Sequence, residues 1–188
     1  MMPEESENQS AKKHLPGWVV ALSLTVLVGF LSVIGSSLIK KSSPAMHIGD
    51  PIPEFTVSTF SGETYHSADL KGKVVLLNFW ASWCTTCEEE AVALEKVWNE
   101  MQPGGKVIFL GVAWADTEPE ASAYLDKFGI TYPNGMDLGT RVSQLFRITG
   151  VPETYIFDTS GNLAAVTIGP FGSEAEIRSV IEGLLPEG

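Results

Sequence analysis

The residues of this chain that are best suited to covalent chemistry are two cysteines, Cys84 and Cys87. They are the only cysteines among 188 residues, Thr85 and Thr86 separate them, and Trp83 precedes them. Two thiols at this spacing can form a disulfide with each other, and a thiolate can attack a disulfide in another molecule. The pair therefore predicts thiol–disulfide exchange, whereas two cysteines are too few for a disulfide-rich scaffold.

A buried strand and an amphipathic helix are expected to flank the two cysteines. Val74–Phe79 is a continuous apolar run, typical of a strand covered on both faces. From Cys87 to about Met101, apolar residues recur at helical spacing. A helix N-terminus presents unpaired N–H groups and a partial positive charge, which stabilise a thiolate. We therefore expect Cys84 to be the nucleophile and Cys87, one turn further along, to resolve the mixed disulfide.

Three other uses of a cysteine pair compete with disulfide exchange. A structural zinc site needs about four ligands, and the histidines lie outside this segment, at positions 14, 47 and 66. Covalent haem attachment requires a histidine directly after the second cysteine, where this chain has Glu88. We therefore expect neither a metal nor a cofactor. An inert disulfide in a tethered, non-catalytic peptide-binding module stays open as an alternative.

An uncharged run from Trp18 to Ile39 predicts a transmembrane signal-anchor helix. The run contains 22 residues, and a bilayer core of about 30 Å needs roughly 20 apolar residues. A cleaved signal peptide has a shorter apolar region of about 7–15 residues, and a buried core helix would carry a polar stripe. Two lysines flank the run on each side, so the positive-inside rule leaves the orientation open.

The composition divides the chain into four predicted parts. Residues 1–17 form a polar, disordered tail, 18–39 the anchor, 40–47 a linker and 48–188 one compact domain. The formal net charge is −11. An excess of acidic side chains disfavours nucleic-acid binding, because that affinity comes from basic surface meeting phosphate.

Within the predicted compact domain, strands alternate with helices. Besides the strand and helix around the cysteines, we predict strands at Phe55–Thr59, Tyr65–His66, Val107–Val112, Thr154–Asp158 and Leu163–Ile168, and helices at Glu118–Phe128, Arg141–Phe146 and from Ser173 to about Leu185. This order ends in a hairpin and a helix. It predicts an α/β domain with a mixed central sheet flanked by helices.

Five motifs in this domain resemble those of one group of redox proteins. They are the segments Gly49–Phe55, Leu70–Val74, Val74–Cys87, Gly111-Val112 and Gly150–Thr154. With them the chain resembles the membrane-tethered TlpA/ResA/CcmG (DsbE) group of thiol–disulfide oxidoreductases, within the AhpC/TSA–redoxin superfamily. The resemblance covers about residues 47–185. It implies a thioredoxin-like fold with an N-terminal β extension.

The resemblance also implies a substrate-binding loop at Pro152. Thioredoxin-like proteins carry a cis proline opposite the two cysteines, although most X–Pro bonds are trans. By this likeness we expect a cis bond between Val151 and Pro152, with backbone groups left free to pair with an extended substrate. Trp83, Val151 and Pro152 are therefore the expected substrate-binding residues, and Cys84–Cys87 the expected redox disulfide.

Two glutamates are further candidates for the catalytic site. Glu90 lies three residues after Cys87, hence on the same helical face, and a glutamate at this place in the group tunes thiol acidity and proton transfer. Glu153 follows Pro152 and matches the group's Pro-Glu-Thr pattern. Thioredoxin has a buried aspartate where this chain has Asn78, and an asparagine cannot take up a proton at neutral pH. Proton handling is therefore expected to fall to the two glutamates.

The resemblance implies a membrane protein with its catalytic domain on the extracytoplasmic side. The expected reaction is reduction of substrate disulfides, in particular the CxxCH cysteines of apocytochrome c before haem attachment. A membrane thiol-reductant of the CcdA/DsbD kind would then regenerate the dithiol. A general disulfide reductase or oxidase and a thiol peroxidase are the rival enzyme functions.

Overall fold

The computed structural model describes residues 17–41 and 46–186, apart from the side chains at 20 and 33–41. The contacts divide the chain into two units, Met1–Pro44 and Ala45–Gly188. In the first unit the described element is helix α1, Gly17–Lys41. No helix among the described residues is long and apolar enough to cross a membrane. Most of the expected tail, part of the linker and some side chains of the expected anchor lie outside what the structure describes, so these three parts stay predictions.

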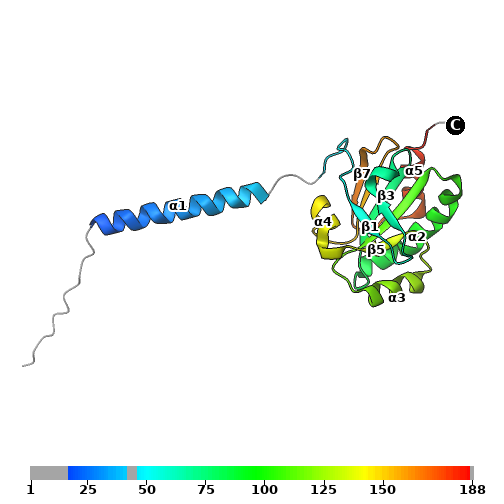
Figure 1. The fold of residues 1–188 in the computed structure, drawn as a ribbon, viewed down its shortest axis with the longest axis horizontal. Coiled ribbons are helices and arrows are strands. Elements are labelled where there is room, and N and C mark those ends of the chain that lie inside the picture. Colours follow the sequence, from blue (N-terminus) through cyan, green and yellow to red (C-terminus); the bar gives the residue numbers. More distant parts are fainter. Residues whose placement is uncertain (1–16, 42–45, 187–188) are drawn as a thin grey trace, which may run out of the picture. The chain divides into compact units, whose positions relative to one another are not determined.

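The second unit is built on a five-stranded mixed sheet with the order β5-β4-β3-β6-β7 (Figure 1). At its centre, β3 (Val74–Trp80) pairs in parallel with β4 (Val107–Ala113) and antiparallel with β6 (Glu153–Phe157). The edges are β5 (Asn134–Met136), parallel to β4, and β7 (Leu163–Ile168), antiparallel to β6. The predicted mixed sheet is therefore confirmed.

The burial of the two central strands β3 and β4 is explained by their composition. All seven residues of β3 and all seven of β4 are buried, which agrees with their continuous apolar runs. By contrast, β5 was not predicted. Its sequence Asn134-Gly135-Met136 lacks the β-branched and aromatic residues that favour strands, and it is a strand because it pairs with Gly111–Ala113 of β4.

Helices cover both faces of the sheet. On one face lie α2 (Thr85–Met101), α3 (Glu118–Phe128) and α5 (Glu174–Glu182), and on the other α4 (Arg141–Phe146). Successive side chains of β3 distinguish the two faces. Trp80 stacks on Tyr124 of α3, whereas the ring of Phe79 contacts that of Phe146 in α4. Right-handed crossovers from β3 to β4 and from β4 to β5 place α2 and α3 on the same face.

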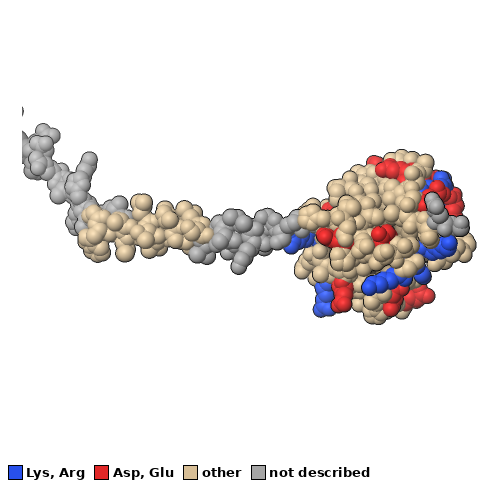
Figure 2. Space-filling model, turned by 90° about the horizontal axis from the view of Figure 1, so that it is seen from above, with Lys and Arg blue, Asp and Glu red and all other residues tan. Residues whose placement is uncertain are grey.

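Exposed ion pairs join the helices of the α2 face. They are Lys96–Glu174 and Glu100–Arg178 between α2 and α5, and Glu88–Lys127 between α2 and α3. Figure 2 shows acidic and basic side chains together on the surface of this domain. Because such pairs are solvated, they contribute little to stability, and the packed apolar faces hold the helices.

The expected N-terminal β extension is a small separate sheet. β1 (Thr56–Ser58) pairs antiparallel with β2 (Thr64–His66), and Thr59 bridges to Gly135 of β5. Phe55 packs edge-on against Phe146, so the extension covers α4 on its side of the main sheet. Three short 3-10 helices complete the described elements, at Ser67–Leu70, Gln102–Gly104 and Leu138–Thr140.

A substitution at Gly111 of β4 tests the packing of β5, the strand that the sequence did not predict, against β4. A Cβ at this position would overlap Asn134 Oδ1 and come within 2.9 Å of Trp80 Nε1. Those two atoms form a buried hydrogen bond of 2.8 Å. We expect Gly111→Ala to lower the free energy of unfolding by about 3 kcal/mol, through overpacking and loss of this bond.

Urea denaturation of the variant measures that loss. Gly104→Ala is the matched control, because a Cβ there meets nothing within 4 Å. Equal stability of the two variants would contradict the packing described for β5.

Candidate active site

Cys84 and Cys87 form a disulfide at the N-terminus of α2, as predicted. The helix begins at Thr85, two residues before the predicted start, so Cys84 itself is the N-cap residue. Its Sγ accepts a hydrogen bond of 3.1 Å from the backbone N–H of Cys87. Because the free N–H groups of a helix start lie around Cys84, a thiolate formed there is stabilised.

The loop before β6 lies against the disulfide. Cys84 Sγ is 3.5 Å from the carbonyl oxygen of Val151, although the two residues are 67 apart in the sequence. The peptide bond between Val151 and Pro152 is cis, which confirms the expectation. The N–H of Gly169, at the end of β7, donates to the Pro152 carbonyl at 2.9 Å. Val151 and Pro152 thus lie beside the reactive sulfur, and their binding of a substrate backbone stays a prediction.

Trp83 lies beside the disulfide on the surface. Trp83 is 57% exposed to solvent, and its indole N–H donates a hydrogen bond of 3.0 Å to the carbonyl of Ala115. The structure therefore brings Trp83, Val151 and Pro152 together around Cys84, and their binding of substrate stays a prediction.

Glu90 is buried, with 1% of its surface exposed. One carboxylate oxygen accepts a hydrogen bond of 2.9 Å from the Asn78 amide, and the other accepts one of 2.9 Å from the Phe171 backbone N–H. Burial raises the pKa of Glu90 to about 7, although both hydrogen bonds favour the carboxylate. This carboxyl, one helical turn after Cys87, can therefore accept or release a proton at neutral pH.

Two partners in this buried network could not be predicted. The Asn78 amide also donates to the hydroxyl of Thr154 at 2.9 Å, which ties β3 to β6. Sequence reasoning used Thr154 as part of a motif and as the start of a strand, but not as a hydrogen-bond partner of Asn78. It missed Phe171 altogether, because the donor there is a backbone N–H and no side-chain type signals it.

Glu153 lies on the opposite face of the sheet from Glu90. Glu153 pairs with Phe79 across the sheet, and the ring of Phe79 faces α4. Asn78, the preceding residue of β3, points to the α2 face and donates a hydrogen bond to Glu90. The Glu153 carboxylate accepts hydrogen bonds from the Thr149 and Gly150 N–H groups, at 3.1 and 3.2 Å, and from the Tyr155 hydroxyl at 3.1 Å. Glu153 thus holds the loop that leads to Pro152, and its part in proton transfer stays a prediction.

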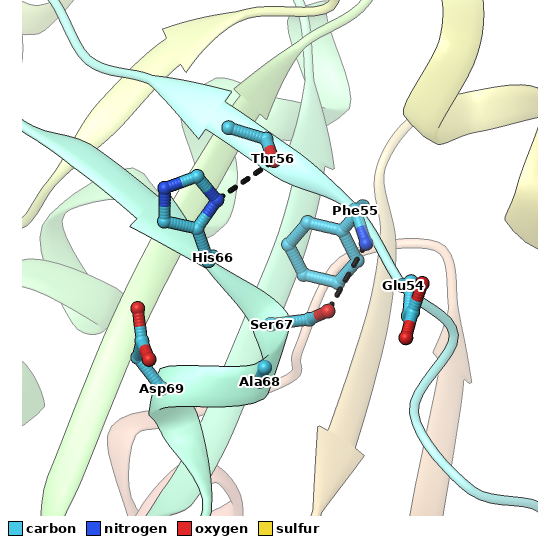
Figure 3. Close-up of a pocket in the computed structure, with 7 residues that line it drawn as sticks. All are labelled: Glu54, Phe55, Thr56, His66, Ser67, Ala68 and Asp69. Carbon is cyan, nitrogen blue, oxygen red and sulfur yellow. Dashed lines mark hydrogen bonds between the residues drawn. The ribbon is translucent and has the colours of Figure 1, made fainter.

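The disulfide does not line the hollow drawn in Figure 3. That hollow lies at the N-terminal extension, where the Phe55 N–H donates to Ser67 Oγ and the Thr56 hydroxyl pairs with His66 Nδ1. Within the described part of the chain, no three His, Cys, Asp or Glu residues are grouped as metal ligands. The arrangement around Cys84 supports chemistry between two sulfur atoms at a surface.

The titration of Glu90 predicts a pH dependence of stability. In the unfolded chain its carboxyl ionises near the ordinary pKa of 4.5, and in the fold near 7. Between these values the unfolded chain binds fewer protons, so the free energy of unfolding falls as the pH rises. We expect a fall of up to about 3 kcal/mol in the wild type. In Glu90→Gln this component is absent, because the amide does not ionise.

Urea unfolding of the oxidised chains between pH 4.5 and 8 measures this difference. Glu89→Gln removes an exposed carboxylate from the same helix and should keep the wild-type slope. Parallel curves for the wild type and Glu90→Gln would show that the buried carboxyl does not titrate in this range.

Comparison with known proteins agrees with this site. The AhpC/TSA family model matches residues 48–166. The chain is 31% identical to the thioredoxin-like protein YneN of Bacillus subtilis, over 82% of this chain and 91% of that protein. It is also 31% identical to the thiol:disulfide interchange protein DsbE of Allochromatium vinosum, over 93% and 95% of the two chains.

A solved structure also resembles this chain. A thiol:disulfide interchange protein of the thioredoxin family from Chlorobium tepidum superposes with a TM-score of 0.64 at 30% identity, covering 74% of this chain and 99% of that one. This chain and the Chlorobium protein therefore share the thioredoxin fold. With its disulfide at the start of α2 and its cis proline opposite, the chain belongs to the AhpC/TSA family, as a thioredoxin-fold protein-disulfide oxidoreductase.

Proposed function

We propose that this protein is a membrane-tethered reductant of disulfides in extracytoplasmic polypeptides, with the CxxCH cysteines of apocytochrome c as its substrate. The observation that carries the exchange chemistry is the position of Glu90, a buried carboxyl with a pKa of about 7 one turn after Cys87. A reductant must deprotonate its second thiol to release the product, and this carboxyl is suited to receive that proton.

The reaction takes place in two exchanges. In the reduced protein, the Cys84 thiolate attacks one sulfur of the substrate disulfide. A bond forms between Cys84 and that sulfur, the substrate S–S bond breaks, and the departing substrate thiolate takes a proton from water. Cys87 then transfers its proton to Glu90 and attacks Cys84 Sγ, which releases the second substrate thiolate. The substrate gains two electrons, and the protein ends with the disulfide described above.

The choice of substrate and location rests on the sequence and on relatives. The resemblance to the TlpA/ResA/CcmG group suggests apocytochrome c and a CcdA/DsbD-type electron donor. Relatives bear the names ResA and DsbE. The tether rests on the 22 uncharged residues from Trp18 to Ile39, and a dedicated disulfide-exchange protein is expected outside the reducing cytosol.

The reduction potential of Cys84–Cys87 tests the direction of electron flow. We expect a value near that of thioredoxin, about −270 mV, or lower. Equilibration of the full chain with glutathione buffers of known ratio measures it. A value near about −120 mV would mean a disulfide-forming oxidant and would refute the proposed reduction.

Trapping with a peptide tests the substrate. We expect reduced Cys87→Ser to accumulate a mixed disulfide with an oxidised Cys-x-x-Cys-His peptide, because the resolving thiol is absent. Mass spectrometry detects the adduct, and Cys84→Ser is the matched control that should give none. If the wild type reduces insulin as fast as this peptide, the protein is instead a general reductase.

Cell fractionation tests the tether. The full chain should sediment with membranes and be released by detergent but not by alkaline carbonate, because about 20 apolar residues in a helix span the bilayer core. A full chain found in the soluble fraction would refute the anchor and leave the disulfide chemistry untouched.

A further inference from the structure

The segment between β4 and α3 contacts the residues that immediately precede the nucleophile. Asp116 Oδ1 accepts a hydrogen bond of 2.9 Å from the Ser82 hydroxyl, and its other oxygen accepts one from the Ser82 backbone N–H. Asp116 Oδ1 also accepts the Thr117 N–H at 2.8 Å. A single carboxylate, 34 residues away in the sequence, therefore holds the connection between β3 and Cys84.

The same segment holds Trp83 from one side. The indole N–H donates to the Ala115 carbonyl at 3.0 Å, and the ring centroid lies 6.2 Å from that of Trp114. Ala115 has a φ of 50°, in the left-handed region that a residue with a Cβ disfavours. Its neighbour Trp114 is anchored by an N–H bond of 2.8 Å to the Trp80 carbonyl. More than half of Trp83 is nevertheless exposed.

We propose that Asp116 is a positioning residue for polypeptide substrates. By holding Ser82, it keeps Trp83 in one orientation, so that the exposed ring forms a preformed docking surface for the chain around the target disulfide. A contact that is ordered before the encounter loses less entropy on binding. The inference concerns the exchange reaction itself and holds for any polypeptide substrate.

The nucleophile has anchors of its own. The Cys84 N–H donates to the Ala81 carbonyl at 3.2 Å, and Cys84 Sγ accepts from the Cys87 N–H. Neither bond involves Asp116. Loss of the Asp116 carboxylate should therefore impair the reaction with a polypeptide much more than the reaction with a small disulfide that does not reach Trp83.

The experiment compares two disulfides in single-turnover reactions of the pre-reduced full chain. Insulin is the polypeptide probe and 2-hydroxyethyl disulfide the small one. We expect Asp116→Ala to lower the second-order rate constant with insulin about tenfold and with the small disulfide less than about twofold. Asp116→Asn, which keeps one acceptor oxygen, should give an intermediate loss with insulin. Ser82→Ala, which keeps the backbone bond, should give the smallest loss.

Glu118→Ala is the control for charge. It removes an exposed carboxylate two residues away that has no hydrogen bond or ion pair to any residue in the described part of the chain, and it should leave both rates unchanged. Equal losses with both disulfides in Asp116→Ala would mean that the residue supports the nucleophile or the fold, and would overturn the proposal. An unchanged rate with insulin would overturn it as well.

Discussion

The pairing of β3 with its two neighbours determines where every part of the site lies. β3 is buried along its whole length, so its chain reaches the surface beyond Trp80 and enters α2 through Cys84. Parallel β4 ends at the same edge of the sheet, and antiparallel β6 begins there, because Ala113 pairs with Trp80 and Glu153 with Phe79. Residues from three distant parts of the chain therefore meet around the segment Ser82–Cys84.

Burying a polar group inside such a sheet costs free energy unless its hydrogen bonds are satisfied. The network of Asn78, Thr154 and Glu90 meets this requirement, and among the described residues no buried side-chain oxygen or nitrogen lacks a partner. Burial still disfavours the charged form of Glu90, which raises the pKa of its carboxyl. The fold thus keeps a carboxyl that exchanges protons near neutral pH close to the helix start where thiolates form.

The two glutamates that follow the reactive motifs have different surroundings. Alternation along β6 directs Glu153 to the α4 face, where two backbone N–H groups and the Tyr155 hydroxyl occupy its oxygens. Glu90 lies on the α2 face with a titratable carboxyl. One glutamate therefore supports the shape of the Pro152 loop, and the other is suited to move protons.

The local features of this protein follow from short stretches of its sequence. The strand before the cysteines, the helix after them and the disulfide between them depend on apolar runs and on a spacing of three residues. The resemblance supplied the cis proline. Other features arise from contacts between distant segments: strand β5, the Phe171 donor, the face on which Glu153 lies and the contact of Asp116 with Ser82. Each of these depends on backbone groups or strand pairing between distant segments, which no side-chain pattern in a single segment records.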